Sequence, residues 1–238
     1  MLENISADCD GVKLVSSDST GFPETLLNPP KLPSGKIDNL ALAEVGRKLG
    51  LNAIVSGQVV NIAMTREQEG ILWFRDLEDR LRIQFHIAVF DTETATKLFS
   101  RQFVHQRELE PQEAEAIKSG SPALFSILSE SIGEITEDLA DDICAAILNQ
   151  PWAGYVVSVQ PDRVTLSFGS DIGVRTGDKF EVHEMGEVIE GVDGHQFILP
   201  GKKIGEITIT ATESGFSEAE IVSGEGIRSG AVVRFGNS

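Results

Sequence analysis

The peptide Gln150-Pro151-Trp152 divides this chain of 238 residues into two parts with different sequence patterns. Before it, long segments show helical spacing or strict alternation of apolar side chains, and after it short β-type segments follow one another with glycine turns between them. Because proline lacks an amide hydrogen and clashes with the preceding turn, a helix ends here. The pattern predicts two domains, an α/β domain over residues 1–150 and a small β-barrel domain over residues 151–238.

In the first part, a strand followed by a hairpin is the clearest β signal. Leu81, Ile83, Phe85, Ile87 and Val89 alternate with more polar neighbours, which is the period of a strand with one buried face. Residues 91–94 have the composition of a turn, and residues 97–104 return as the partner strand.

A helix is predicted upstream of this hairpin. Asp38 suits its N-cap, and Leu42, Val45 and Leu49 form one apolar face before Gly50 ends it. Residues 53–60 are apolar and β-branched enough for a buried strand.

Residues 121–150 carry the pattern of a much longer helix. Ser121 and Pro122 suit its first turn, and an apolar stripe follows at three- and four-residue intervals. This stripe comprises Leu124, Ile127, Leu128, Ile132, Ile135, Leu139, Ile143 and Ile147. We expect it to lie across a sheet. The expected fold class is α+β, with a long covering helix in the first domain and a small all-β barrel as the second. The family resemblance described below implies that the first domain is a truncated α/β sandwich.

The second part shows no convincing helical period. Gly-rich turns separate its short β segments, as expected for a small closed barrel whose corners need positive φ angles. The six predicted strands are residues 155–159, 163–168, 179–183, 204–210, 217–222 and 231–235.

Four large apolar residues, Ile71, Leu72, Trp73 and Phe74, stand together inside a charged segment. On an exposed loop tip they would form a contact surface for another protein, and they are the partner-binding candidates of this chain. The alternative is that the segment extends the hairpin strands and places Leu72 or Trp73 on the core. Trp73→Ala would separate the two, weakening partner binding in the first case and folding in the second.

The charge balance argues against several classes of partner. There are 37 acidic and 20 basic residues, and a formal net charge of −17 repels nucleic acid. The acidic residues are spread along the chain, which is typical of a solvated surface. No stretch of about 18 apolar residues occurs, so no transmembrane helix is predicted.

No residue pattern points to catalysis, to a cofactor or to a metal. The four histidines have no metal-ligand spacing, and HExxH, GxSxG and GxGxxG motifs are absent. His183 and Glu184 are adjacent on a predicted strand and so point to opposite faces. We therefore expect a protein that is not an enzyme, although residues far apart in the sequence can still assemble into a site.

The two cysteines leave their pairing open. A disulfide between Cys9 and Cys144 is possible in an oxidising compartment, but two cysteines so far apart in sequence do not decide it. Asp8 before Cys9 does not suit a lipid-attachment site, and residues 1–3 show no signal-peptide features. A signal peptide is expected to be absent or already removed.

Two segments of the first part resemble a known domain. Residues 43–57 read Ala-Glu-Val-Gly-Arg-Lys-Leu-Gly-Leu-Asn-Ala-Ile-Val-Ser-Gly, and residues 89–94 read Val-Phe-Asp-Thr-Glu-Thr. Both are similar to passages of envelope proteins with a TolB-amino-terminal-like or curli-secretion-like α/β domain. The long helix before Pro151 lies where theirs does.

The second part resembles the carboxy-terminal barrel of the flagellar assembly protein T family. The similar positions include Val157-Ser158-Val159, Gly169-Ser170, Gly173-Val174, a run from Gly177 to Val182, and Ile204-Gly205-Glu206-Ile207. Together the two resemblances cover about residues 38–235. Full-length family members carry a signal peptide and a further amino-terminal domain. Their α/β domain opens with a strand and a helix, and the resemblance leads us to expect that these two elements are missing before Leu2 in this chain.

The resemblance implies a periplasmic, non-enzymatic protein that helps to build a ring around the flagellar basal body, with no cofactor. Its partners would be other envelope proteins, with self-association into a ring as a further possibility. The alternative from a different class is a regulatory or ligand-binding envelope module, such as an outer-membrane lipoprotein that activates cell-wall synthesis.

Overall fold

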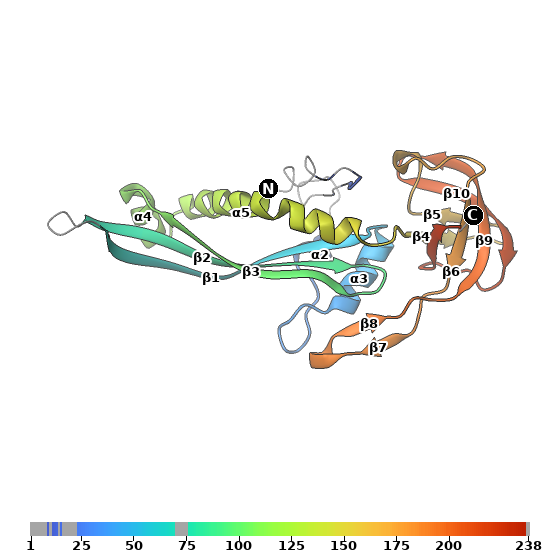
Figure 1. Ribbon diagram of the computed structural model, residues 1–238, viewed down its shortest axis with the longest axis horizontal. Coiled ribbons are helices and arrows are strands. Elements are labelled where there is room, and N and C mark those ends of the chain that lie inside the picture. The colour runs from blue at the N-terminus through green and yellow to red at the C-terminus, as the bar shows by residue number, and fades with distance from the viewer. Residues whose placement is uncertain (1–8, 10, 14, 16–22, 70–75, 237–238) are drawn as a thin grey trace. The chain divides into compact units, whose positions relative to one another are not determined.

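The computed structural model describes residues 9, 11–13, 15, 23–69 and 76–236. The chain forms two compact units, and each is assembled from separate stretches of sequence (Figure 1). The first unit comprises Met1–Ser16, Val55–Val89 and Phe99–Asn149, and the second comprises Ser17–Ile54, Phe90–Leu98 and Gln150–Ser238.

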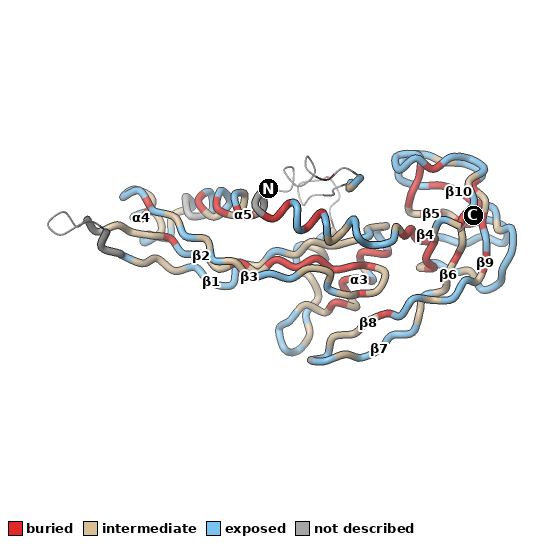
Figure 2. The backbone as a smooth tube through the Cα atoms, in the orientation of Figure 1, coloured by how far each residue is buried: buried red, intermediate tan, exposed pale blue. Residues whose placement is uncertain are grey.

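Three strands form one sheet in the order β1-β2-β3. They are β1 (Ala53–Glu69), β2 (Asp76–Asp91) and β3 (Lys97–Glu108). Leu81, Ile83, Phe85, Ile87 and Val89 of β2 are all buried, as predicted (red along β2 in Figure 2). The alternation holds only as far as Ile87, because Ala88 and Phe90 are buried too. A short turn joins β2 to β3, as predicted, so these two strands run antiparallel.

Among the described residues, the first unit contains the helices α4 (Pro111–Lys118) and α5 (Ala123–Leu148). The sequence reasoning missed α4, whose start is fixed by a reciprocal capping box between Glu110 and Glu113. In α5 the stripe residues Ile135, Leu139 and Ile143 are buried. Arg101 of β3 forms an ion pair with Asp142 of α5, at 2.7 Å.

The expected α+β fold class, with a truncated α/β sandwich under a long covering helix, is wrong. Strand makes up 43% of the chain and helix 24%, and the strands form a closed barrel and two small sheets. The long helix exists as α5, but across residues 23–69 and 76–236 no α/β sandwich is found for it to cover. The reason for the error is that alternation shows which face of one strand is buried, and does not reveal how many layers the domain contains.

The barrel that was expected at the end of the chain is confirmed. Its closed strand order is β10-β5-β4-β11-β6-β9, and the registers between neighbouring strands are antiparallel. The strands are β4 (Gly154–Val159), β5 (Arg163–Leu166), β6 (Lys179–His183), β9 (Lys203–Glu213), β10 (Phe216–Gly224) and β11 (Val232–Phe235). Closure removes the open strand edges that a flat sheet would leave.

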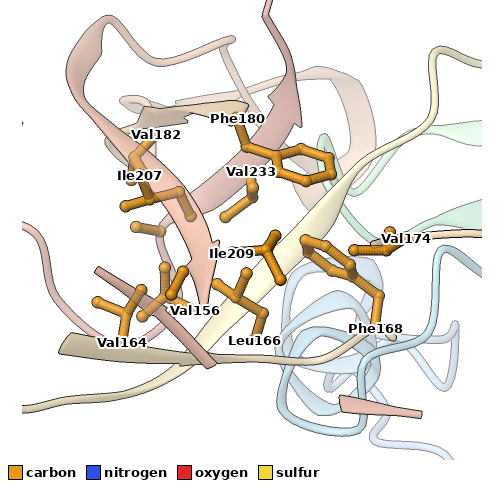
Figure 3. Close-up of a cluster of buried hydrophobic side chains, with 12 residues drawn as sticks. Val156, Val164, Leu166, Phe168, Val174, Phe180, Val182, Ile207, Ile209 and Val233 are labelled. Carbon is orange, nitrogen blue, oxygen red and sulfur yellow. The ribbon is translucent and has the colours of Figure 1, made fainter. Parts of the chain in front are cut away.

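Apolar side chains from all six barrel strands and their connections fill the barrel interior (Figure 3). Phe180, Val182, Leu166 and Ile207 are among the most completely buried residues. The Phe180 ring lies 5.3 Å from that of Phe168, centroid to centroid. The alternating pattern of each predicted strand therefore builds a single core.

Outside the barrel, the second unit contains helices and a small hairpin. Within the described part of this unit, the helices are α2 (Glu24–Leu27) and α3 (Asn39–Lys48), and the single 3₁₀ turns are η1 (Ser170–Ile172) and η2 (Val192–Gly194). The hairpin pairs β7 (Val188–Glu190) with β8 (Gln196–Ile198), and the sequence reasoning missed it.

Helix α3 begins as predicted, because the Asp38 carboxylate accepts a hydrogen bond from the Ala41 amide at 3.0 Å. Its buried face differs from the prediction. Leu42 is buried together with Asn39, Ala43, Gly46 and Arg47, whereas Leu49 is 42% exposed. Gly50 then ends the helix with a φ of +72°.

Candidate functional site

The turn between β2 and β3 is held by the side chain of Asp91. Its carboxylate accepts hydrogen bonds from the backbone amides of Glu93 at 3.2 Å and Thr94 at 2.9 Å, and from the Thr94 hydroxyl. Aspartate often closes a turn in this way. Ala95 follows in the left-handed region with a φ of +58°.

A buried polar cluster attaches this turn to the rest of the second unit. The Thr92 hydroxyl lies 2.8 Å from the Tyr155 hydroxyl and 2.9 Å from the carbonyl oxygen of Asn52. Arg47 Nη1 donates to the Thr92 carbonyl oxygen at 2.6 Å. Thr92 and Tyr155 are at most 1% exposed. Leaving a buried polar group without a hydrogen-bond partner costs free energy, so the cluster favours a single arrangement of β4, α3 and the turn.

Burial also governs the protonation of this cluster. It raises the pKa of the Tyr155 hydroxyl above its usual value, and the Thr92 hydrogen bond only partly opposes this shift. Burial lowers the pKa of Arg47, against the opposing effect of Tyr155 and of the carboxylates of Glu44, Asp91 and Glu93. Both shifts favour the neutral forms, as expected in a poorly solvated site.

Asn39, the first residue of α3, links the turn to the β7–β8 hairpin. Its Nδ2 donates to the carbonyl oxygens of Ala95 at 2.8 Å and Gln196 at 2.5 Å. Ile198 of β8 adds an apolar contact, because it is buried in a cluster with Ala43 and Ala95. The hairpin is therefore seated on α3 and on the turn through β8.

A cleft of about 670 Å³ lies in the second unit beside the same turn. Its walls include Glu93, Trp152, Glu181, His183 and Arg234. Residues of the turn, of the segment after α5, and of β6 and β11 thus meet around one hollow. No sequence motif indicated that the ionisable residues of these elements would lie close together.

The charged groups of the cleft pair with each other or with nearby residues. Arg234 donates to Glu93 at 2.5 Å. Glu181 accepts from Lys203 at 2.8 Å, and its Oε2 lies 3.4 Å from Nε2 of His183. The hydrogen bond from Lys203 is the main cause of the lowered pKa of Glu181, with a smaller contribution from His183. Trp152 adds an aromatic surface to the cleft, and its ring lies 4.9 Å from that of Phe235.

The pair of His183 with Glu181 was missed because only the adjacent Glu184 was considered. Residues two apart on a strand share a face, so the predicted strand over residues 179–183 already contained the signal.

The β7–β8 hairpin presents exposed apolar side chains. Val188 and Ile189 are each 40% exposed, and Val192 beyond the strand is 83% exposed. Met185 and Leu199 at the base of the hairpin are 51% and 44% exposed. Groups of exposed apolar side chains often mark protein contacts.

The partner-binding candidates Ile71, Leu72, Trp73 and Phe74 lie outside the described residues. Strands β1 and β2 are described up to Glu69 and from Asp76 on either side of them. The choice between a contact surface and a core position for Trp73 stays open.

Neither a metal site nor a membrane-spanning helix is present among the described residues. No cluster of three or more His, Cys, Asp or Glu side chains with a geometry suited to a metal ion was found among them. The helices within residues 23–69 and 76–236 are too short or too polar to cross a bilayer.

No protein-family model matches the chain, and no curated protein sequence matches it. The resemblance to the flagellar assembly protein T family therefore stays a prediction from the motifs.

Proposed function

We propose that this protein is a non-enzymatic assembly or scaffold protein of the bacterial cell envelope. It acts in the periplasm through protein–protein contacts, as its resemblance to the flagellar assembly protein T family implies. The observation that carries the proposal is the disulfide between Cys9 and Cys144. Disulfides persist in oxidising compartments such as the periplasm and are rare in the cytosol.

Two further observations support a role in binding. Charged side chains of the cleft are engaged in ion pairs, Arg234 with Glu93 and Glu181 with Lys203. The exposed apolar side chains of the β7–β8 hairpin provide contact area. A protein that acts through contact surfaces needs a rigid support for them. The buried polar cluster around Thr92 provides such a support, because it connects β4, α3 and the β2–β3 turn.

The test combines the redox state of the cysteines with cross-linking in the native cell. Mass spectrometry under non-reducing conditions should recover the Cys9–Cys144 linked peptides from the envelope fraction. A photo-reactive residue in place of Ile189 should capture envelope proteins, whereas one at the exposed Val222 of β10 serves as the matched control. Reduced thiols in the native protein, or cross-links only to cytosolic proteins, would contradict the proposal.

The cleft favours a second candidate, a regulatory or ligand-binding envelope module such as a lipoprotein activator of cell-wall synthesis. Its volume of about 670 Å³ is within the range of small-molecule sites, and the Trp152 ring suits stacking against a ligand. Calorimetric titration with cell-wall saccharide fragments should then show binding, and Trp152→Ala should weaken it at least tenfold. Binding of unchanged affinity in Trp152→Ala would exclude the cleft as the binding site.

A further inference from the structure

The two outer edges of the β7–β8 hairpin differ in their hydrogen bonding. Gly191 N donates to His195 O at 2.7 Å, and Leu199 N donates to Glu187 O at 2.9 Å. Because bonded and non-bonded pairs alternate in an antiparallel ladder, the pairs Val188–Ile198 and Glu190–Gln196 are the non-bonded ones. The backbone groups of these four residues therefore point away from the hairpin.

The outward groups of β8 are occupied within the second unit. Ile198 N donates to Thr94 O at 2.8 Å, and Gln196 O accepts from Asn39 Nδ2. On the other side, β8 is the only strand that pairs with β7 among the residues that the structure describes. The amide and carbonyl groups of Val188 and Glu190 thus form an open edge. The hairpin that carries this edge is anchored through β8 to α3 and to the β2–β3 turn.

The side chains along this edge define the chemistry of an occupant. Val188 and Ile189 are exposed on opposite faces of β7, so an added strand would find an apolar contact on each face. Glu187 and Glu190 are exposed beside them. Residues 180–201 contain no Lys or Arg, so the whole hairpin segment is acidic.

We propose that β7 binds an extended segment of another protein by strand addition, and that this segment carries Lys or Arg beside apolar residues. The inference rests on the proposed function and names the partner chemistry for it. Main-chain hydrogen bonds to Val188 and Glu190 would supply the pairing, and the basic side chains would match Glu187 and Glu190. Such a strand would occupy the edge that natural proteins rarely leave unprotected.

A second copy of this chain is a poorer occupant. It would bring the same glutamates to the opposite strand, where like charges destabilise pairing, and each copy adds a net charge of −17. Charge complementarity therefore favours a cationic partner over self-association at this edge.

The experiment selects short peptides from a displayed random library on the full chain. The main variant is Val188→Pro, which removes an outward amide hydrogen and no bond of the β7–β8 ladder, so the hairpin can still form. Val188→Thr keeps the amide and is the matched control. We expect selected peptides that alternate apolar residues and carry net positive charge, bind Val188→Thr normally and bind Val188→Pro at least tenfold more weakly.

Two further measurements locate the peptide. Amide exchange at Val188 and Glu190 should slow at least tenfold on binding. Reversal of charge in Glu187→Lys with Glu190→Lys should weaken binding by a similar factor, whereas Glu218→Lys with Glu220→Lys on the exposed face of β10 should have a much smaller effect.

Several outcomes would overturn the inference. Peptides that bind Val188→Pro as tightly as the wild type, or that carry net negative charge, contradict strand addition to this edge. A dimer in sedimentation that Val188→Pro dissociates would assign the edge to a second copy. These outcomes would contradict strand addition but not the proposed envelope function, provided that cross-links to envelope proteins are still found. Reduced cysteines in the native protein would contradict the envelope function, and peptide binding to β7 would be unaffected by that result.

Discussion

The two units of the molecule are stabilised in different ways. In the first, an open three-stranded sheet and α5 bury one apolar stripe each, and a disulfide closes a loop of sequence separation 135. In the second, a closed barrel encloses a continuous apolar core, and a buried polar cluster around Thr92 and Tyr155 attaches segments from distant parts of the chain. The difference teaches that the first unit is held in part by a covalent link between Cys9 and α5, whereas the closed ladder of strands in the second unit leaves no open edges.

The largest effect is expected on removal of the disulfide. Replacing both Cys9 and Cys144 by Ala should lower the free energy of unfolding of the first unit by up to roughly 5 kcal/mol, because the closed loop is so long. Site-resolved amide exchange in denaturant measures it, with Ile143 of α5 reporting the first unit and Ile207 of β9 the second. An equal loss of amide exchange protection at Ile143 and Ile207 would show that the two units unfold together, and would contradict the view that they are stabilised separately.

A substitution in the barrel core should destabilise the second unit much more than the first. Phe180 is 1% exposed and packs against Phe168, so Phe180→Ala should cost the second unit about 3–5 kcal/mol through lost contacts and a cavity. Phe180→Leu, which keeps most of the volume, is the milder control. Protection at Ile143 should change little, and a loss there as large as at Ile207 would show that the barrel core also supports the first unit.

An intermediate effect is expected in the buried polar cluster. Thr92→Val removes a hydroxyl that contacts Tyr155 and a backbone carbonyl, leaving buried partners unpaired, and should cost about 1–3 kcal/mol. Tyr155→Phe should cost less in the Thr92→Val background than in the wild type, because both lose the same hydrogen bond.

The control for this pair is Thr165→Val, which removes an exposed hydrogen bond to Ser158 on the barrel surface. It should change stability by no more than about 0.5 kcal/mol. Fully additive effects of Thr92→Val and Tyr155→Phe would contradict the cluster.

The smallest effect concerns a surface ion pair of the first unit. Hydrogen bonds from Arg66 at 2.8 Å and Lys118 at 3.0 Å lower the pKa of Asp79 from 3.8 to about 2. A folded-state pKa below the unfolded one means that the stabilisation is present above about pH 3.8 and is lost as the pH falls toward 2. An NMR titration of the Asp79 carboxyl group measures this shift.

Arg66→Gln is the informative variant for the ion pair, because the Arg66 hydrogen bond is the main cause of the shift. The pKa of Asp79 should return part of the way to its ordinary value, with only a slight loss of stability at neutral pH. An unchanged pKa would show that Arg66 does not form this pair in solution.

Much of the local structure follows from the sequence. The six barrel strands were predicted close to their observed bounds because glycine turns mark both ends of most of them. The five apolar residues predicted to be buried in β2 are buried, and so are Ile127, Ile135, Leu139 and Ile143 of the eight-residue α5 stripe. The short strands β7 and β8 were not predicted, because three residues are too few to show a period.

The candidate sites were much harder to predict. The cleft takes residues from the β2–β3 turn, from the segment after α5, and from β6 and β11, so no local motif signals it. The open edge of β7 depends on which backbone groups Asn39 and Thr94 occupy on β8. Side-chain patterns do not encode that pairing.

Periodicity and turn chemistry in the sequence alone determined that this chain ends in a barrel and carries one long helix, since both signals act between residues close along the chain. Only the tertiary structure decided that Cys9 reaches Cys144, that the turn at Thr92 packs against Tyr155, and that α3 joins the barrel strands in one compact unit. Such contacts join residues tens of positions apart, and they form when apolar burial and hydrogen bonding across the whole chain outweigh the entropy of bringing the segments together.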